Sequence, residues 1–162
     1  MKKRFLIISV ISALAVLVID QFSKYFAIKK IPDSGIFLWE KFLSFDLTYN
    51  YGISFGINFP AWTITILTVG LIALLLYFFY NQFKQSNFFI SLLISLAAAA
   101  AISNFADRLF HGGVVDFISI QINSFTWPSF NFADIVITVC AIVLIITFFR
   151  NEKTPFKDDV CN

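Results

Sequence analysis

The chain carries little charge for its length. Only 14% of its 162 residues are charged, whereas 59% are hydrophobic, and an average soluble domain has about 25% charged residues. So few charges cannot cover a folded surface in water, and we therefore predict that lipid is the solvent. This composition excludes a cytosolic enzyme and a disordered tail. The net charge of +2 is too small to indicate nucleic-acid binding.

The sequence also lacks most of the side-chain sets that carry out hydrolysis. His111 is the only histidine, and without an H-E-x-x-H motif a zinc protease is not expected. A Ser-His-Asp arrangement would have to use His111, and there is no Walker loop for nucleotide hydrolysis. The two cysteines, Cys140 and Cys161, do not make a disulfide framework. Carboxylates are the reactive groups that remain.

Four long apolar stretches are present instead. A bilayer core about 30 Å thick is crossed by about 20 helical residues. Four segments have this length and character: about residues 5–28, 61–80, 88–106 and 133–149. We predict an integral membrane α-helical fold with four transmembrane helices, in a single membrane domain over residues 1–162. The run Ala97–Ala101 indicates close helix packing, because small residues let backbones approach.

The N-terminus permits a second interpretation. Lys2-Lys3-Arg4 followed by an apolar run is also typical of a secretory signal peptide. No small-x-small cleavage site follows Ile19, and the helix pattern continues through Asp20, Gln21 and Lys24. These features favour a retained membrane anchor.

Basic residues are distributed unevenly between the two sides of the predicted membrane domain. Four spans put both termini on one side, and this side has an excess of basic residues: Lys2, Lys3, Arg4, Lys84, Arg150, Lys153 and Lys157. The other side has more acidic than basic residues. Since loops rich in lysine and arginine stay in the cytoplasm, we expect both termini there. The two long loops, residues 29–60 and 107–132, are then extracytoplasmic.

Both long loops contain segments with the pattern of β-strands. Phe42–Tyr49 alternates partly between apolar and polar residues, and Asp116–Asn123 alternates cleanly from Phe117 on. Period-two patterns rich in Ile, Phe and Tyr indicate short strands, so we predict a small sheet at the outer membrane surface. Irregular loops with aromatic residues in the interface are the alternative.

Asp20, Asn104 and Asp134 are expected at one depth in the membrane. Counting along each span puts them roughly 5–6 Å inside the outer boundary, at about 1.5 Å per residue. Ionisable residues inside a membrane are costly and mark a functional site by default. Two simpler roles stay open. Asp20 and Lys24 have the i, i+4 spacing of a helix ion pair, and Asn131 can cap the helix that carries Asp134.

Asp116 and Asp134 are the candidates for chemistry, because both have apolar sequence neighbours. Two carboxylates brought together in a low dielectric cannot easily both ionise, so one keeps a proton and the pair titrates as a unit. Such a dyad can hold a water, deprotonate it and protonate a leaving amine. The two residues meet only if the outer loop folds back.

Two other classes of function remain open at this point. A small proton-coupled transporter also uses intramembrane acids, but it needs access from both faces, and the cytoplasmic halves of these helices carry no ionisable residue. A non-enzymatic membrane adaptor would need no buried carboxylates.

Five short motifs, in order along the four spans, resemble the lipoprotein signal peptidase (signal peptidase II) family. They are Asp20-Gln-Phe-Ser-Lys24, Asn50-Tyr-Gly-Ile-Ser-Phe-Gly56, Asn104-Phe-Ala-Asp-Arg108, Gly113-Val-Val-Asp-Phe117 and Pro128-Ser-Phe-Asn-Phe-Ala-Asp134. The resemblance covers essentially the whole chain. It implies a bacterial inner-membrane aspartyl protease with four transmembrane helices and a small extracytoplasmic β-cradle, acting on prolipoproteins just before a cysteine that carries diacylglyceryl.

The resemblance also implies the roles of individual residues. Asp116 and Asp134 are then the catalytic dyad. The positions that support the dyad or hold substrate are Asp20, Lys24, Asn50, Gly52, Asn104, Arg108, Asn131 and Ala133. We expect no metal or cofactor, a monomer, and membrane lipid and the lipidated prolipoprotein as partners. One departure is Ser103, where the family usually has glycine; serine also packs closely.

Overall fold

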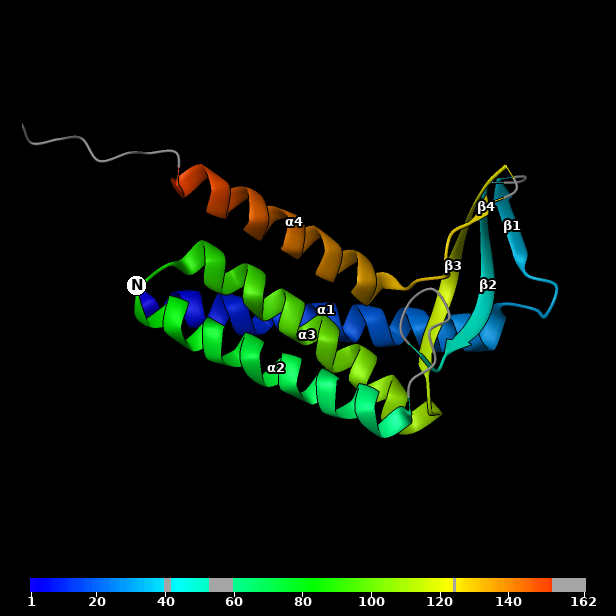
Figure 1. The fold of residues 1–162 in the computed structure, drawn as a ribbon, viewed down its shortest axis with the longest axis horizontal. Coiled ribbons are helices and arrows are strands. Elements are labelled where there is room, and N and C mark those ends of the chain that lie inside the picture. The colour runs from blue at the N-terminus through cyan, green and yellow to red at the C-terminus, as the bar shows by residue number, and fades with distance from the viewer. Residues whose placement is uncertain (40–41, 53–59, 124, 153–162) are drawn as a thin grey trace, which may run out of the picture.

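Four long helices run together, and a small sheet lies across one end of them (Figure 1). The structure is a computed structural model that describes residues 1–39, 42–52, 60–123 and 125–152. The helices are α1 (Lys2–Lys30), α2 (Ala61–Lys84), α3 (Phe88–His111) and α4 (Phe132–Glu152). The strands are β1 (Ile36–Trp39), β2 (Leu43–Asn50), β3 (Val114–Ile122) and β4 (Phe125–Thr126).

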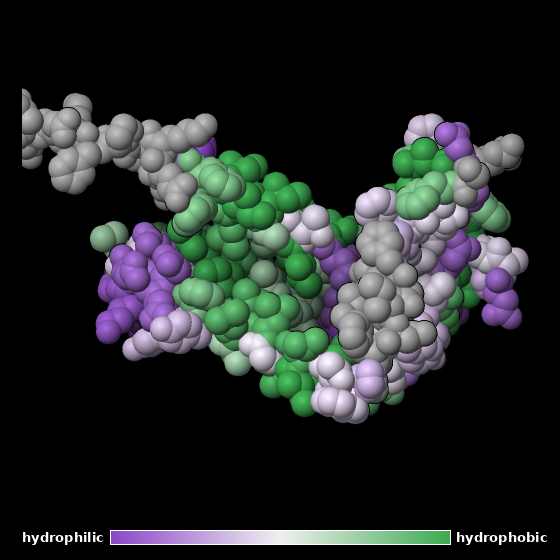
Figure 2. Space-filling view, in the orientation of Figure 1, coloured by the Kyte–Doolittle hydropathy of each residue, from purple (hydrophilic) through white to green (hydrophobic). Residues whose placement is uncertain are grey.

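All four helices are long and apolar enough to cross a membrane, which confirms the predicted membrane fold. Helix α3 is central, because it packs against α1, α2 and α4. The buried share of its apolar stretch is 56%, against 11% or less in the others. Residues 97–101 are all buried in α3, as the alanine run predicted. The outer faces of the helices expose large hydrophobic side chains, and Figure 2 shows the broad apolar surface that lipid would cover.

Helix α3 extends further than its predicted span. The apolar count stops at residue 106 because Asp107 and Arg108 follow, but the helix continues to His111. It ends at Gly112, which has a φ of 77° in the left-handed region and donates its N–H to the Arg108 carbonyl. Asp107 is buried in this extension and paired with Lys24, which lowers the free-energy cost of a charged residue at this position.

The sheet is antiparallel with strand order β1-β2-β3-β4. Strands β2 and β3 confirm the two predicted strands within two residues at each end, whereas β1 and β4 had no clear signal in the sequence. The first part of β3, residues 114–117, is buried. Thr48 of β2 is paired with Asp116 of β3. The sheet therefore carries Asp116 to the end of the helix bundle.

The N-terminus and the α2–α3 connection lie at the opposite end of the bundle from the sheet (Figure 1). Lys2 Nζ donates to the Lys84 carbonyl oxygen at 3.1 Å, which ties these two segments together. The basic residues that begin the chain are thus separated from Asp116 by the length of the helices. Lys153 and Lys157, used in the orientation argument, lie outside the described residues.

Candidate active site

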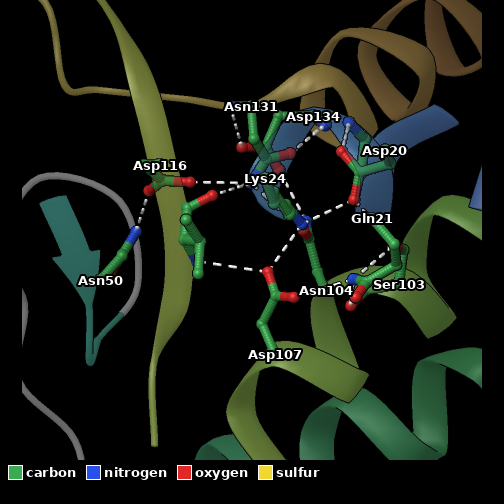
Figure 3. Close-up of polar contacts among 12 residues, drawn as sticks. Asp20, Gln21, Lys24, Asn50, Ser103, Asn104, Asp107, Asp116, Asn131 and Asp134 are labelled. Carbon is green, nitrogen blue, oxygen red and sulfur yellow. Dashed lines mark hydrogen bonds and ion pairs between the residues drawn. The ribbon is translucent and has the colours of Figure 1, made fainter. Parts of the chain in front are cut away.

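Asn131 joins the two candidate carboxylates. Its Nδ2 donates to Asp116 Oδ1 at 2.7 Å, and its Oδ1 accepts the backbone N–H of Asp134 at 3.0 Å. The Asn131 N–H donates back to Asp134 Oδ2 at 3.2 Å, which is a reciprocal helix cap. The chain folds back as required because Phe130 forms a bridge with Ile118 of β3. Asp116 and Asp134 therefore meet at the start of α4 (Figure 3).

Two further asparagines hold the outer sides of this pair. Asn104 of α3 donates from Nδ2 to Asp134 Oδ1 at 2.8 Å. Asn50 at the end of β2 donates from Nδ2 to Asp116 Oδ2 at 3.2 Å. Among the described residues, the hydrogen bonds recorded to these two carboxylate side chains all come from amides. The hydrogen bonds that orient the pair are thus made by neutral donors.

The environment of Asp116 alters its acidity. Burial raises the pKa of its carboxyl to about 6, and the charge of Asp134 acts in the same direction. The hydrogen bonds from Asn50 and Asn131 and the charge of Lys24 oppose these effects on the pKa. A carboxyl with this pKa is present in both protonated and ionised forms near neutral pH. This suits a group that must both accept and give a proton.

Lys24 lies at the centre of the buried polar network beside the dyad (Figure 3). Its Nζ contacts Asp20 Oδ2 at 2.6 Å, Asp107 Oδ2 at 2.7 Å and Asn104 Oδ1 at 2.7 Å. Lys24 is 2% exposed, Asp20 0% and Asp107 1%. The predicted ion pair between Asp20 and Lys24 is confirmed, but it is one part of a larger cluster. Burial of one cation with two acids costs desolvation free energy, and this cost stays low only where the buried groups are paired. Lys24, Asp20 and Asp107 each have such partners.

The two acids of this cluster bind backbone next to the dyad. Asp20 Oδ1 accepts the N–H of Ala133 at 2.8 Å, at the N-terminus of α4, where helix N–H groups have no partner within the helix. Asp107 Oδ2 accepts the N–H of Val115 at 3.2 Å. The side chain of Ala133 is fully buried, so a larger residue would disturb this contact.

A cleft of about 660 Å³ opens beside the dyad. Its polar lining includes Asn50, Gly52, Asn104, Arg108, Asp116 and Asp134. Its apolar walls come from α2 and α4 and include Ile64, Leu67, Leu71, Ile135 and Val139. Arg108 Nη2 contacts the Gly52 carbonyl oxygen at 3.4 Å. Figure 2 shows a notch between the helices and the sheet with hydrophilic residues at its base. A peptide can lie against the carboxylates here while an apolar chain lies along the helices.

The sequence matches the family described as Signal peptidase (SPase) II over residues 12–150. The chain belongs to the signal peptidase II family. It is therefore a membrane protease that removes signal peptides, and the transporter alternative is not supported. It is a multi-pass protein of the bacterial inner membrane.

Relatives and solved structures agree with this assignment. This signal peptidase is 35% identical to a lipoprotein signal peptidase of Staphylococcus aureus (strain bovine RF122 / ET3-1) and 33% identical to that of strain JH9, with 98% of each chain covered in both cases. A solved structure described as a bacterial membrane enzyme at 2.3 Å resolution matches with a TM-score of 0.79 and 33% identity, over 94% of both chains. A second bacterial membrane enzyme, at 1.9 Å resolution, matches with a TM-score of 0.73 and 32% identity, over 86% of this chain and 91% of that one.

His111 and Cys140 of the signal peptidase lie apart from the dyad. The exposed His111 is in the last turn of α3, beside the ring of Tyr49. Cys140 is buried in an apolar cluster with Leu93 and Ala97. Neither residue lines the cleft beside the dyad.

The structure brings together all ten candidate residues of this signal peptidase, while residues 53–56 of the second motif lie outside the described residues. Sequence reasoning missed the contacts that Gln21 and Ser103 make in this network. Gln21 Nε2 donates to Asp107 Oδ1 at 2.8 Å and to Ser103 Oγ at 2.9 Å. Ser103 Oγ donates to Asp20 Oδ2 at 2.7 Å. The signal was the position of Gln21 inside a span, next to Asp20.

Proposed function

We propose that this signal peptidase is an aspartyl enzyme that cleaves prolipoproteins just before a cysteine carrying diacylglyceryl, with Asp116 and Asp134 as its catalytic dyad. The observation that carries the proposal is the pair of carboxylates held by Asn131 at one cleft. The substrate class follows from the relatives named lipoprotein signal peptidase. Incubation of the purified protein with a diacylglyceryl-modified prolipoprotein, followed by product analysis, tests it.

The reaction needs one ionised and one protonated carboxyl group. The ionised carboxylate takes a proton from a water, and the water oxygen attacks the carbonyl carbon of the scissile peptide bond. The protonated carboxyl donates to the carbonyl oxygen as charge develops there. The C–N bond then breaks as the leaving amine receives a proton from one carboxyl, while a hydroxyl of the tetrahedral intermediate returns its proton to the other carboxylate. The dyad ends with one shared proton, as it began, and no other reactant besides water is required.

The other candidate residues divide into two groups by what they contact. The first group holds the dyad and the backbone that carries it: Asp20, Lys24, Asn104, Asn131 and Ala133. The second group lines the cleft and holds the substrate in this proposal: Asn50, Gly52 and Arg108. Asn50 also donates to Asp116, so it serves both purposes. Both catalytic carboxylates and all supporting groups belong to one chain, so a monomer is sufficient for activity.

The proposed orientation puts both termini and the α2–α3 connection in the cytoplasm and the active site at the extracytoplasmic face. The excess of lysine and arginine at the termini motivates it. Reporter fusions placed after Gln82 and after Gln121 are expected to report opposite compartments, with Gln82 in the cytoplasm. The same compartment for both positions, or the reverse arrangement, would contradict this topology.

Substitution of Arg108 by lysine tests whether the cleft uses the shape of the guanidinium. The group has several fixed donors that suit peptide carbonyl or phosphate-like oxygens, and lysine has a single flexible ammonium group. Arg108→Lys is therefore expected to lower kcat/KM roughly tenfold or more. Arg150→Lys, at the exposed far end of α4, is the matched control and should have normal activity. Full activity in Arg108→Lys would show that positive charge alone is sufficient.

A further inference from the structure

Five buried or partly buried side chains form a closed ring of contacts between α1 and α3. Lys24 Nζ contacts both Asp20 Oδ2 and Asp107 Oδ2. On the other side, Ser103 Oγ donates to Asp20 Oδ2, and Gln21 Nε2 donates to both Ser103 Oγ and Asp107 Oδ1. Asp20 and Asp107 are thus linked twice, once through the lysine and once through the glutamine and serine (Figure 3).

The remaining carboxylate contacts of this ring point to the dyad. Asp20 accepts the backbone N–H of Ala133, which directly precedes Asp134. Asp107 accepts the backbone N–H of Val115, which directly precedes Asp116. Each acid of the ring therefore holds the peptide group one residue before a catalytic carboxylate, although the two catalytic residues come from a helix and a strand.

We propose that this ring is a positioning device that sets the separation of Asp116 and Asp134, and that Gln21 and Ser103 are positioning residues for the reaction. The proposal rests on the proposed aspartyl function. Lysine alone is a poor spacer, because its ammonium group is a point charge on a flexible stem. The planar amide of Gln21 and the short side chain of Ser103 fix the second link, so the two acids cannot rotate independently.

The effect on catalysis follows from geometry, not from contact with substrate. Neither Gln21 nor Ser103 lines the cleft, so their substitution cannot remove a substrate contact. Both residues are neutral, so their removal changes no buried charge, but it takes one hydrogen bond from Asp107 or Asp20, and the folded fraction is therefore measured as well. A displacement of about 1 Å between reacting groups can lower a rate by about 10²-fold. The expected signature is a change in kcat without a comparable change in KM.

The test compares Gln21→Met and Ser103→Ala with two control variants. Methionine has nearly the shape of glutamine but no N–H donor, and alanine removes only the hydroxyl. Gln82→Met and Ser95→Ala are the controls, because their hydrogen bonds are confined to the α2–α3 connection and to α3 itself. Turnover of a diacylglyceryl-modified prolipoprotein is measured per folded molecule, with the folded fraction taken from thermal unfolding.

Gln21→Met and Ser103→Ala are expected to lower kcat about tenfold or more with KM within about twofold of the wild type, while the controls keep wild-type values. A purely structural role would reduce the folded fraction and leave kcat per folded molecule unchanged, and that result would overturn the proposal. Asp116→Asn is measured in parallel. An inactive Asp116→Asn beside a fully active Gln21→Met rejects the ring and leaves the aspartyl function intact, whereas an active Asp116→Asn rejects both.

Discussion

Asp116→Asn and Asp134→Asn are each expected to lower turnover by about 10²- to 10⁴-fold, the usual contribution of a positioned acid or base. Asparagine has nearly the shape of aspartate but cannot take up and release a proton. Asp116 accepts hydrogen bonds on both of its carboxylate oxygens, from Asn131 and Asn50. An amide at this position can accept only one of them, so a modest loss of stability accompanies the loss of activity.

The kinetics are measured on protein shown to be folded and inserted in the membrane or detergent micelle. His111→Ala and Cys140→Ala are the matched controls, since neither side chain lies in the cleft; both should stay active. Near-normal turnover in either aspartate variant would rule out aspartyl catalysis at that residue. Loss of activity in a control would instead point to cysteine or histidine chemistry.

A prolipoprotein without its diacylglyceryl group is expected to be cut at least about 10²-fold more slowly than the modified form. The dyad lies in a cleft whose apolar walls are formed by α2 and α4, two helices long and apolar enough to cross a membrane. An unmodified peptide reaches this depth only by giving up its hydration. Each buried methylene of an acyl chain contributes about 0.8 kcal/mol to membrane partition, so the lipid holds the scissile bond at the level of the carboxylates.

The two substrates are compared at the same concentration in the same detergent, across a range of concentrations. Slow cleavage of the unmodified form even at high concentration is the expected outcome. A matched pair of substrates with identical sequences isolates the lipid as the only variable. Comparable turnover of both forms would refute lipid-directed placement and would favour a general membrane protease.

Much of the membrane fold could be predicted because hydropathy and length are strong signals. A run such as Ala61–Tyr80 has few alternatives to a membrane helix. The end of α3 could not be predicted in this way, because the hydropathy count stops at the charged Asp107, whereas the structure pairs Asp107 with Lys24 and continues the helix. Strand β1 is a short apolar segment without alternation, so its pairing with β2 depends on tertiary structure.

Part of the candidate site could be predicted, because a charged or polar side chain inside a lipid bilayer costs free energy and so indicates a function. Asp20, Asn104 and Asp134 stood out for that reason, and the structure links Asn104 directly to Asp134. Gln21 and Ser103 gave little signal, because a neutral polar side chain in a membrane helix costs much less free energy than a charged one. Its presence in a span therefore does not by itself indicate a functional site. Their positions in the ring follow from the packing of α1 against α3, which spacing along one helix does not specify.

The most direct test of the central claim is mass analysis of the products formed from one diacylglyceryl-modified prolipoprotein by the wild type and by the Asp116→Asn and Asp134→Asn variants. For the wild type we predict two products, the intact signal peptide and a protein that begins at the lipidated cysteine, and for each variant we predict uncut substrate. Cleavage at another bond, or the same two products from either variant at wild-type yield, would contradict the proposal that Asp116 and Asp134 cut before the lipidated cysteine.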